Sequence, residues 1–166
     1  AKTIVNFTML SPSYLSLAGS DLTVEGDANI AGILAATGTE TLTFKGDVAF
    51  TGGTFTQAQS TAYLADTDAQ SPTSDGVAFY TLIPSNSGRT VTCTDVVTAE
   101  MLRNESVNLA LSGGITSTTV RVYSGEGAIT LTVGAGTKSQ VQDLFLLGTS
   151  GKVITLVSSS GGTQWD

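Results

Sequence analysis

Residues 22–32 read Leu-Thr-Val-Glu-Gly-Asp-Ala-Asn-Ile-Ala-Gly, and residues 42–52 read Leu-Thr-Phe-Lys-Gly-Asp-Val-Ala-Phe-Thr-Gly. The two stretches begin twenty residues apart and share Leu, Thr, Gly, Asp and Gly at equivalent positions. In both, apolar and polar side chains alternate, which is the period of a half-buried β-strand. The Gly-Asp pair in the middle of each stretch indicates a tight turn or a bulge. The repeat therefore predicts β-structure in units of twenty residues.

The apolar face of this repeat needs a partner surface, because two such units cannot close a core by themselves. Equivalent faces of neighbouring chains can meet around a three-fold axis, so we predict a trimerisation region over residues 21–56. The alternative is an ordinary β-meander whose two hairpins pack on the later part of the same chain. The candidate subunit-interface residues are Leu22, Val24, Ile30, Leu42, Phe44, Val48 and Phe50.

The segment before the repeat, residues 1–20, is apolar but has no clean period, and Pro12 interrupts any long element. We expect it to act as an N-terminal arm that docks on a partner, or alternatively to add an edge strand to its own domain. The candidate docking residues of this arm are Ile4, Val5, Phe7, Met9, Leu10 and Tyr14.

The chain after the repeat divides into a linker and a β-rich domain. Residues 57–76 are polar and rich in turn-forming residues, so we expect a linker there. Residues 77–166 contain about seven short strand-like runs about ten residues apart, separated by Gly, Ser and Pro. This spacing predicts a jelly-roll-like β-sandwich. The one helical candidate is 98–105, with Thr98 as its cap.

The composition excludes several classes of partner. The chain of 166 residues has a net charge of −7 and only seven lysines and arginines. A nucleic-acid-binding protein needs clustered basic side chains to neutralise phosphates, so we expect no nucleic acid partner. No stretch approaches the ~18 apolar residues of a membrane span, and the N-terminus lacks the pattern of a signal peptide. We therefore expect no membrane partner and synthesis in the cytoplasm.

The residues that usually carry chemistry are scarce. Histidine is absent, which removes the Ser-His-Asp triad and His-ligated zinc, and the single cysteine, Cys93, lies in an alternating run typical of a buried strand. Two carboxylates would suffice for glycoside hydrolysis, but the acids fall mainly on polar faces or in turns. Asp66, Asp68 and Asp75 do not match the spacing of a twelve-residue calcium loop. We expect no enzymatic activity, no cofactor and no metal.

The pattern Leu-Thr-Val-x-Gly-Asp-x-x-Ile-x-Gly, present at residues 22–32 and echoed at 42–52, resembles a segment that recurs in phage tail-fibre and other virion proteins. The end of the chain, from residues 128–133 to Gly-Gly-Thr-Gln-Trp at 161–165, resembles the closing strands of phage fibre and head-decoration domains. This resemblance implies intertwined, trimeric β-structure and carries over no active-site residue. It covers about half of the chain.

These observations lead to an expected function. We expect a non-enzymatic phage structural protein, a capsid decoration or cement protein that binds the major capsid protein as a homotrimer on the outer surface of the virion. The alternative is a receptor-binding tail fibre or tip protein, which predicts an exposed aromatic cluster with Phe79, Tyr80, Tyr123 and Trp165 as candidates. A third alternative, a carboxylate-dependent polysaccharide hydrolase, requires two acids close together in a groove.

Overall fold

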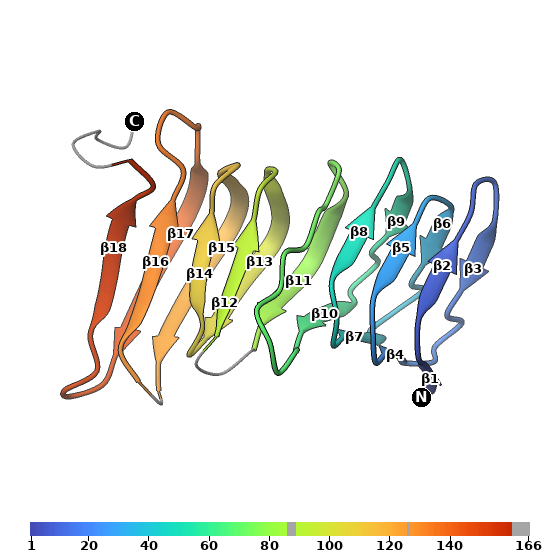
Figure 1. Ribbon diagram of the computed structural model, residues 1–166, viewed down its shortest axis with the longest axis horizontal. Coiled ribbons are helices and arrows are strands. Elements are labelled where there is room, and N and C mark those ends of the chain that lie inside the picture. Colours follow the sequence, from blue (N-terminus) through green and yellow to red (C-terminus); the bar gives the residue numbers. More distant parts are fainter. Residues whose placement is uncertain (86–88, 126, 161–166) are drawn as a thin grey trace.

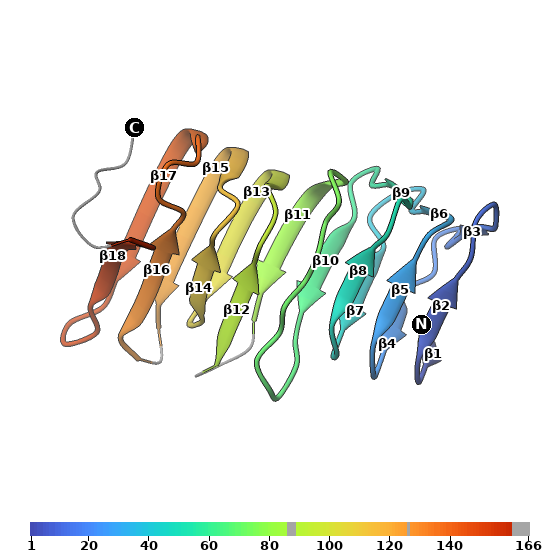
Figure 2. The same ribbon diagram turned by 45° about the horizontal axis from the view of Figure 1, so that its top comes forward.

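The computed structural model describes residues 1–85, 89–125 and 127–160, and this part of the chain is all-β, without a helix. The chain winds into a parallel β-solenoid of about seven turns, which we call coils (Figures 1 and 2). The strands are β1 (Lys2–Ile4), β2 (Phe7–Met9), β3 (Tyr14–Ser16), β4 (Leu22–Val24), β5 (Ala28–Ile30), β6 (Ile33–Ala35), β7 (Thr41–Phe44), β8 (Val48–Phe50), β9 (Thr54–Thr56), β10 (Thr61–Leu64), β11 (Ala78–Pro84), β12 (Thr90–Cys93), β13 (Val97–Glu105), β14 (Asn108–Leu111), β15 (Ile115–Ser124), β16 (Ile129–Val133), β17 (Gln140–Gly148) and β18 (Ile154–Ser158).

One sheet runs the whole length of the solenoid. Its eight strands follow the order β1-β4-β7-β10-β11-β13-β15-β17, and each pair is parallel. Two three-stranded sheets, β2-β5-β8 and β3-β6-β9, close the N-terminal coils, whereas the four-stranded sheet β12-β14-β16-β18 closes the C-terminal coils. The cross-section therefore changes from three sides to two along the rod, as Figure 1 shows.

The twenty-residue repeat is the length of one coil. On the inner face of the long sheet Leu22 pairs with Leu42, Leu42 with Ala62, and the column continues through Leu82 and Leu102 at the same spacing. The next two members of the column are Val120, eighteen residues later, and Leu144, twenty-four residues after that. Apolar side chains at these positions stack into one continuous core, since successive strands lie about 4.8 Å apart.

The Gly-Asp pairs form corners between sides of the solenoid. Gly26 and Gly46 lie in the bends before β5 and β8, and a Cβ on Gly46 would come 2.5 Å from the carbonyl carbon of Gly26 in the preceding coil. The Oδ1 atom of Asp27 accepts a hydrogen bond from the backbone N–H of Asp47 at 2.9 Å. Asp47 accepts one from the N–H of Ser71 at 2.7 Å in the same way. Glycine thus allows the coils to approach, and aspartate bonds each corner to the next.

The predicted jelly-roll-like β-sandwich over residues 77–166 is wrong. A jelly roll is built from antiparallel strands, whereas every pair of named strands here is parallel, and each pair joins strands of successive coils. Alternation of apolar and polar residues marks a strand in either architecture but does not say which strand is its neighbour. The helix predicted at 98–105 is also wrong, because this segment lies in β13 and pairs with both β11 and β15.

The N-terminal arm and the linker expected from the sequence also lie within the solenoid. Residues 1–20 contain β1, β2 and β3, which pair with β4, β5 and β6 of the next coil. Residues 57–76 contain β10 and a long corner, in which Gln70 is buried. The amide Nε2 of Gln70 donates hydrogen bonds to the carbonyl oxygens of Phe44 at 3.2 Å and Gly46 at 2.7 Å, so this corner is anchored to the preceding coil.

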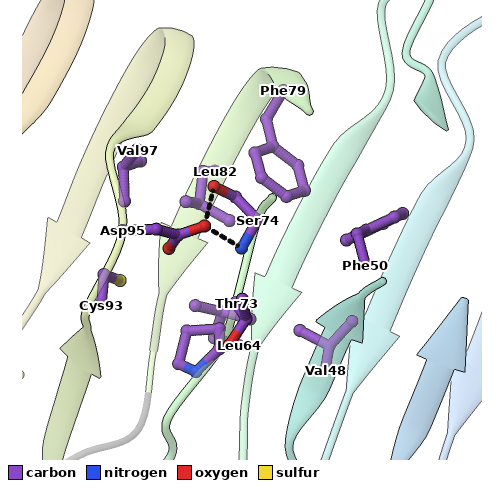
Figure 3. Close-up of a pocket in the computed structure, with 11 residues that line it drawn as sticks. Val48, Phe50, Leu64, Thr73, Ser74, Phe79, Leu82, Cys93, Asp95 and Val97 are labelled. Carbon is purple, nitrogen blue, oxygen red and sulfur yellow. Dashed lines mark hydrogen bonds between the residues drawn. The ribbon is translucent and has the colours of Figure 1, made fainter. Parts of the chain in front are cut away.

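The cross-section changes at a cluster of three aromatic rings. Phe50 and Phe55 end the three-sided part and Phe79 begins the two-sided part, with ring centroids 5.7 to 6.1 Å apart. A small, mainly apolar cavity of about 20 Å³ lies beside them (Figure 3). At its rim the Oδ2 atom of Asp95 accepts hydrogen bonds from the backbone N–H and the hydroxyl of Ser74, both at 2.7 Å. The three aromatic rings therefore pack against one another where the cross-section changes.

Within the described ranges, no helix is long and apolar enough to cross a membrane.

Candidate functional site

The predicted subunit-interface residues all lie inside a single chain. Leu22, Val24, Ile30, Leu42, Phe44, Val48 and Phe50 are between 0 and 2 % exposed. The chain's own coils cover the apolar face that the repeat presents, because the coils before and after each unit stack on it. Their burial is therefore explained without a second subunit, and any contact between chains has to use other surfaces.

The predicted docking residues of the N-terminal arm divide between core and surface. Met9 is buried, while Ile4 and Phe7 pack partly buried against the core. Val5, Leu10 and Tyr14 are exposed on the first coil. The structure therefore leaves three of the six side chains free to meet a partner, spread over the bends and the strand β3 of that coil.

The C-terminal coil carries the largest run of exposed apolar side chains. Leu144, Phe145, Leu146 and Leu147 follow one another in β17, and each is between 42 and 51 % exposed. Leu144 and Leu146 pair with Val120 and Val122 of β15, which are buried. They continue the inner column of the core, but no strand in the described ranges pairs with the far edge of β17. The C-terminal end of the core is therefore open.

An apolar hollow of about 210 Å³ lies at this end of the solenoid, between the long sheet and the four-stranded sheet. Leu144 of β17 and Leu156 of β18 contribute to it, together with inner-facing residues of the two preceding coils. A coil stacked on this end would fill the hollow as each internal coil fills the space above its neighbour. Its lining includes Leu111, Val120, Leu131, Val133, Leu144 and Leu156.

The edge of β17 lacks the features that usually prevent pairing with another strand. Natural proteins protect edge strands with lysine, proline, short length or a bulge. β17 has nine residues, contains neither lysine nor proline, and its one charged side chain is Asp143. An exposed edge of this length and composition is suited to adding a strand from another chain. We call β17, β18 and the hollow between them the open end.

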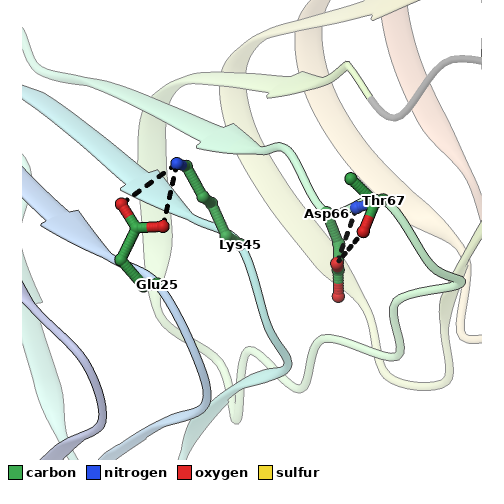
Figure 4. A network of polar contacts seen from close by, with 4 residues as sticks. All are labelled: Glu25, Lys45, Asp66 and Thr67. Carbon is green, nitrogen blue, oxygen red and sulfur yellow. Dashed lines mark hydrogen bonds and ion pairs between the residues drawn. The ribbon is translucent and has the colours of Figure 1, made fainter.

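The chemically reactive residue types lie elsewhere and are held in structural roles. Cys93 is buried, and burial together with the nearby negative charge of Asp95 raises the pKa of its thiol to about 12. The thiol is therefore protonated at neutral pH and is not a nucleophile. Glu25 and Lys45 form an exposed ion pair of 2.9 Å across two coils (Figure 4), which contributes at most about 1 kcal/mol.

Glu40 is a buried carboxylate at the corner before β7. Its oxygens accept hydrogen bonds from the Thr37 hydroxyl at 2.6 Å, the Thr37 N–H at 2.9 Å, the Gly38 N–H at 2.7 Å and the Gly19 N–H at 2.9 Å. The hydrogen bond from the Thr37 hydroxyl is the main cause that lowers the pKa of Glu40 to about 2, against the effect of burial. Because Gly19 belongs to the first coil, Glu40 binds two successive corners together.

The aspartates considered for calcium act as turn residues. Asp66 accepts a hydrogen bond from the backbone N–H of Thr67 (Figure 4) and another from the N–H of Asp68 within its own turn. Asp75 accepts one from Gly52 of the preceding coil. Among the described residues no group of three or more Cys, Asp or Glu side chains is arranged to hold a metal ion.

The exposed aromatic residues differ in part from those expected for a receptor-binding tip. Phe79 is buried, Tyr80 is exposed and Tyr123 is half-buried, while Trp165 lies outside the described residues. Sequence reasoning did not identify Phe145, which is exposed on β17 beside Arg121 of β15. Its neighbours Leu144 and Leu146 were equally missed, since a continuous apolar run such as 144–147 is also typical of a fully buried strand.

In comparisons with known proteins, the chain matches no family model, no curated protein and no solved structure.

Proposed function

We propose that this chain is a non-enzymatic structural module of a virion, of the fibre type, which assembles with a second copy of itself through its open end. The observation that carries the proposal is the C-terminal coil, whose inner-column residues Leu144 and Leu146 belong to the core but are not covered by another coil of the described residues. The resemblance of residues 22–32 and 42–52 to phage fibre segments supports the placement in a virion. A rod of stacked coils is compatible with that role.

The shapes of the two ends of the solenoid indicate what can cover the open end. The N-terminal coil is three-sided and consists of strands of three residues, whereas the C-terminal coil consists of a strand of nine residues and one of five. The N-terminal end of another copy therefore does not match the open end. Two open ends match each other by symmetry, with β17 of one chain antiparallel to β17 of the other.

The energetics of such a contact are favourable for a like-with-like pair. Apolar surface stabilises an interface by about 25 cal/mol per Å² removed from water, and the inner side of β17 offers two large exposed apolar side chains, Leu144 and Leu146. Asp143 is the only charge on β17, so two copies of the strand meet with little repulsion. The antiparallel pair would also satisfy the backbone groups at the edge of β17.

The proposed contact between chains lies in a different part of the molecule from the one expected from the sequence. Residues 21–56, expected to intertwine three chains, are closed by their own coils. Binding to the major capsid protein on the outer surface of the virion stays a proposal for the remaining surface, where Val5, Leu10 and Tyr14 of the first coil are exposed. A homotrimer, the number implied by the resemblance, is the competing stoichiometry.

The molar mass in solution tests the proposal. Light scattering on the full chain is expected to give twice the chain mass of 16.9 kDa, and Leu146→Lys is expected to give single chains, because it places a charge in the paired end. Val5→Lys is the matched control at the other end and is expected to leave the pair intact. Circular dichroism confirms that both variants fold.

Three results would contradict the proposal. A monomeric wild-type protein would exclude self-association through the open end. A mass of three chains would exclude the two-fold pair and support the trimer expected from the sequence. Dissociation by Val5→Lys as well as by Leu146→Lys would mean that the N-terminal coil takes part in the contact.

A further inference from the structure

Two of the chain's few basic side chains lie next to each other on the outer face of the long sheet. Arg103 of β13 pairs in register with Arg121 of β15, and Arg121 pairs with Phe145 of β17. Side chains at paired positions of a parallel sheet project from the same face about 4.8 Å apart. Two like charges at this spacing repel each other, so the pair is unfavourable unless an anion lies close by.

The two guanidinium groups are satisfied to very different degrees. Arg103 forms an ion pair with Glu105 on its own strand. Among the described residues Arg121 has no carboxylate or carbonyl partner, and its Nε atom is buried without a hydrogen bond. Its guanidinium carbon lies 5.3 Å from the centre of the Phe145 ring, which is a cation–π contact. The aromatic ring holds the guanidinium in place but accepts none of its hydrogen bonds.

Arg121 is half-buried, and none of the other described groups on this face forms an ion pair with it. Thr119 and Tyr123 flank it on β15 with hydroxyl groups, and both are half-buried. Asp143 projects from the same face of β17, two residues before Phe145, but does not form an ion pair with Arg121. Glu105 is engaged by Arg103. Among the described residues the guanidinium of Arg121 is therefore left without an ion-pair partner beside an exposed ring.

We propose that this face binds the carboxylate group of an acidic saccharide. The planar fork of Arg121 matches a carboxylate in a bidentate manner, and Arg103 adds a second positive charge beside it. The exposed part of the Phe145 ring offers an apolar surface on which a sugar ring can stack, and Thr119 and Tyr123 offer hydroxyl groups to its hydroxyls. We call this surface the arginine–aromatic face; it is formed by Arg103, Thr119, Arg121, Tyr123 and Phe145.

The surroundings favour a saccharide over other anionic partners. A nucleic acid would bring many phosphates toward a chain of net charge −7 that offers only two neighbouring arginines here. A protein partner usually needs an interface of about 800 Å² on each side with an apolar centre. Along the sheet the outer column that contains Thr119 runs through Met101 to Thr81 and Thr61, whose hydroxyl groups suit a polyhydroxylated ligand.

The face is separate from the proposed contact between chains. Phe145 alternates with Leu144 and Leu146 and so projects from the outer face of the sheet, whereas pairing of two open ends uses the edge of β17 and the inner column. Saccharide binding and self-association can therefore be lost independently of each other. Each has its own variant, Arg121→Gln for the first and Leu146→Lys for the second.

Calorimetric titration of the full chain with trigalacturonate tests the proposal, with the neutral trisaccharide of galactose as the reference ligand. The wild-type protein is expected to bind trigalacturonate and not the neutral sugar. Arg121→Gln is expected to weaken binding at least tenfold, and Arg121→Lys by an intermediate factor, because lysine keeps the charge but loses the fork. Arg89→Gln removes an exposed arginine outside the face and is expected to bind as the wild type does.

The stacking role of the ring has its own test. Phe145→Ala is expected to weaken binding of trigalacturonate while leaving the folded state intact by circular dichroism. Binding of trigalacturonate that is unchanged in Arg121→Gln, or no stronger than that of the neutral sugar, would overturn the site. Equal affinity for a triglutamate peptide would overturn the assignment to a saccharide and indicate a protein ligand.

Discussion

Leu82 and Leu102 occupy the same position in consecutive coils, in register on the inner face of the long sheet, and each is no more than 3 % exposed. The register places twenty residues of chain between two side chains that are neighbours in the core. Stability along the rod therefore depends on contacts between adjacent coils, as in other solenoids.

Truncation of Leu102 should destabilise the protein strongly. Leu102→Ala removes buried apolar groups and leaves a cavity between two coils, so we expect a loss of about 2–5 kcal/mol in the free energy of unfolding, measured by urea denaturation. Thr116→Ala, on the exposed face of β15, is the control and should change it by less than about 0.5 kcal/mol. Similar losses in the two variants would contradict the assignment of Leu102 to the inner column.

The corner glycines should not tolerate a methyl group where two coils touch. In Gly46→Ala the new Cβ would lie 2.5 Å from backbone atoms of Gly26, so the corner has to shift, and we expect the midpoint of thermal unfolding to fall by several degrees. Gly38→Ala is the matched control, because its Cβ would come no closer than 3.8 Å to another residue's atoms. An unfolding midpoint that is unchanged in Gly46→Ala would argue against close stacking of the corners.

Glu40 should make stability depend on pH at the acidic end of the range. Its folded-state pKa of about 2 lies below the ordinary value of 4.5, so its stabilisation is complete above pH 4.5 and is lost as the pH falls toward 2. Glu40→Gln should cost about 2 kcal/mol at pH 7, since the neutral amide replaces a carboxylate that accepts four hydrogen bonds.

The comparison of the two proteins across pH separates this effect from general acid denaturation. The difference in unfolding free energy between wild type and Glu40→Gln should narrow between pH 4.5 and pH 2. Glu100→Gln, an exposed carboxylate on β13, should show no such difference at pH 7. A difference in unfolding free energy between wild type and Glu40→Gln that stays constant from pH 7 to pH 2 would mean that Glu40 is not ionised in the folded state.

The thiol of Cys93 should be inert in the folded protein. Burial raises its pKa to about 12, so almost no thiolate is present at pH 8, and the side chain is also inaccessible. A colorimetric disulfide reagent should give no signal with the native protein and one thiol per chain in urea. The variant Thr92→Cys with Cys93→Ala moves the thiol to the neighbouring, less buried position of β12 and should react without denaturant. Rapid reaction of the native wild type would contradict the burial of Cys93.

The sequence revealed the length of one coil but not how far along the chain the coils continue. The repeat was recognisable in the first copies because Leu22 and Leu42 both begin an alternating run with a Gly-Asp corner. In the fourth coil, which begins with β10, Ala62 replaces leucine and the corner after β10 grows longer, so the motif disappears. The spacing of twenty residues is nevertheless kept between Ala62 and Leu82. The corner after β10 is longer, but this coil has no strand on the third side, so its total length is unchanged.

The candidate sites were beyond the reach of the sequence for two physical reasons. Leu144 and Leu146 lie in a continuous apolar run that a fully buried strand would also have, and they are exposed because no coil of the described chain follows them. Arg121 and Phe145 are twenty-four residues apart, a spacing that departs from the repeat, so no pattern brings them together. The fold class was predictable as all-β, whereas parallel pairing between coils depends on contacts that alternation alone does not specify.

The open end and the arginine–aromatic face exist only if the coils form one continuous stack, and a distance between Thr41 and Thr119 tests this most directly. Both lie in one outer column, which passes through Thr61, Thr81 and Met101. Four steps of about 4.8 Å place their backbones about 19 Å apart. Pulsed electron paramagnetic resonance on Thr41→Cys/Thr119→Cys, spin-labelled in a Cys93→Ala background, should give one narrow distribution near this value. A broad distribution at clearly longer distances, as expected for a repeat region linked to a separate β-sandwich, would contradict the solenoid.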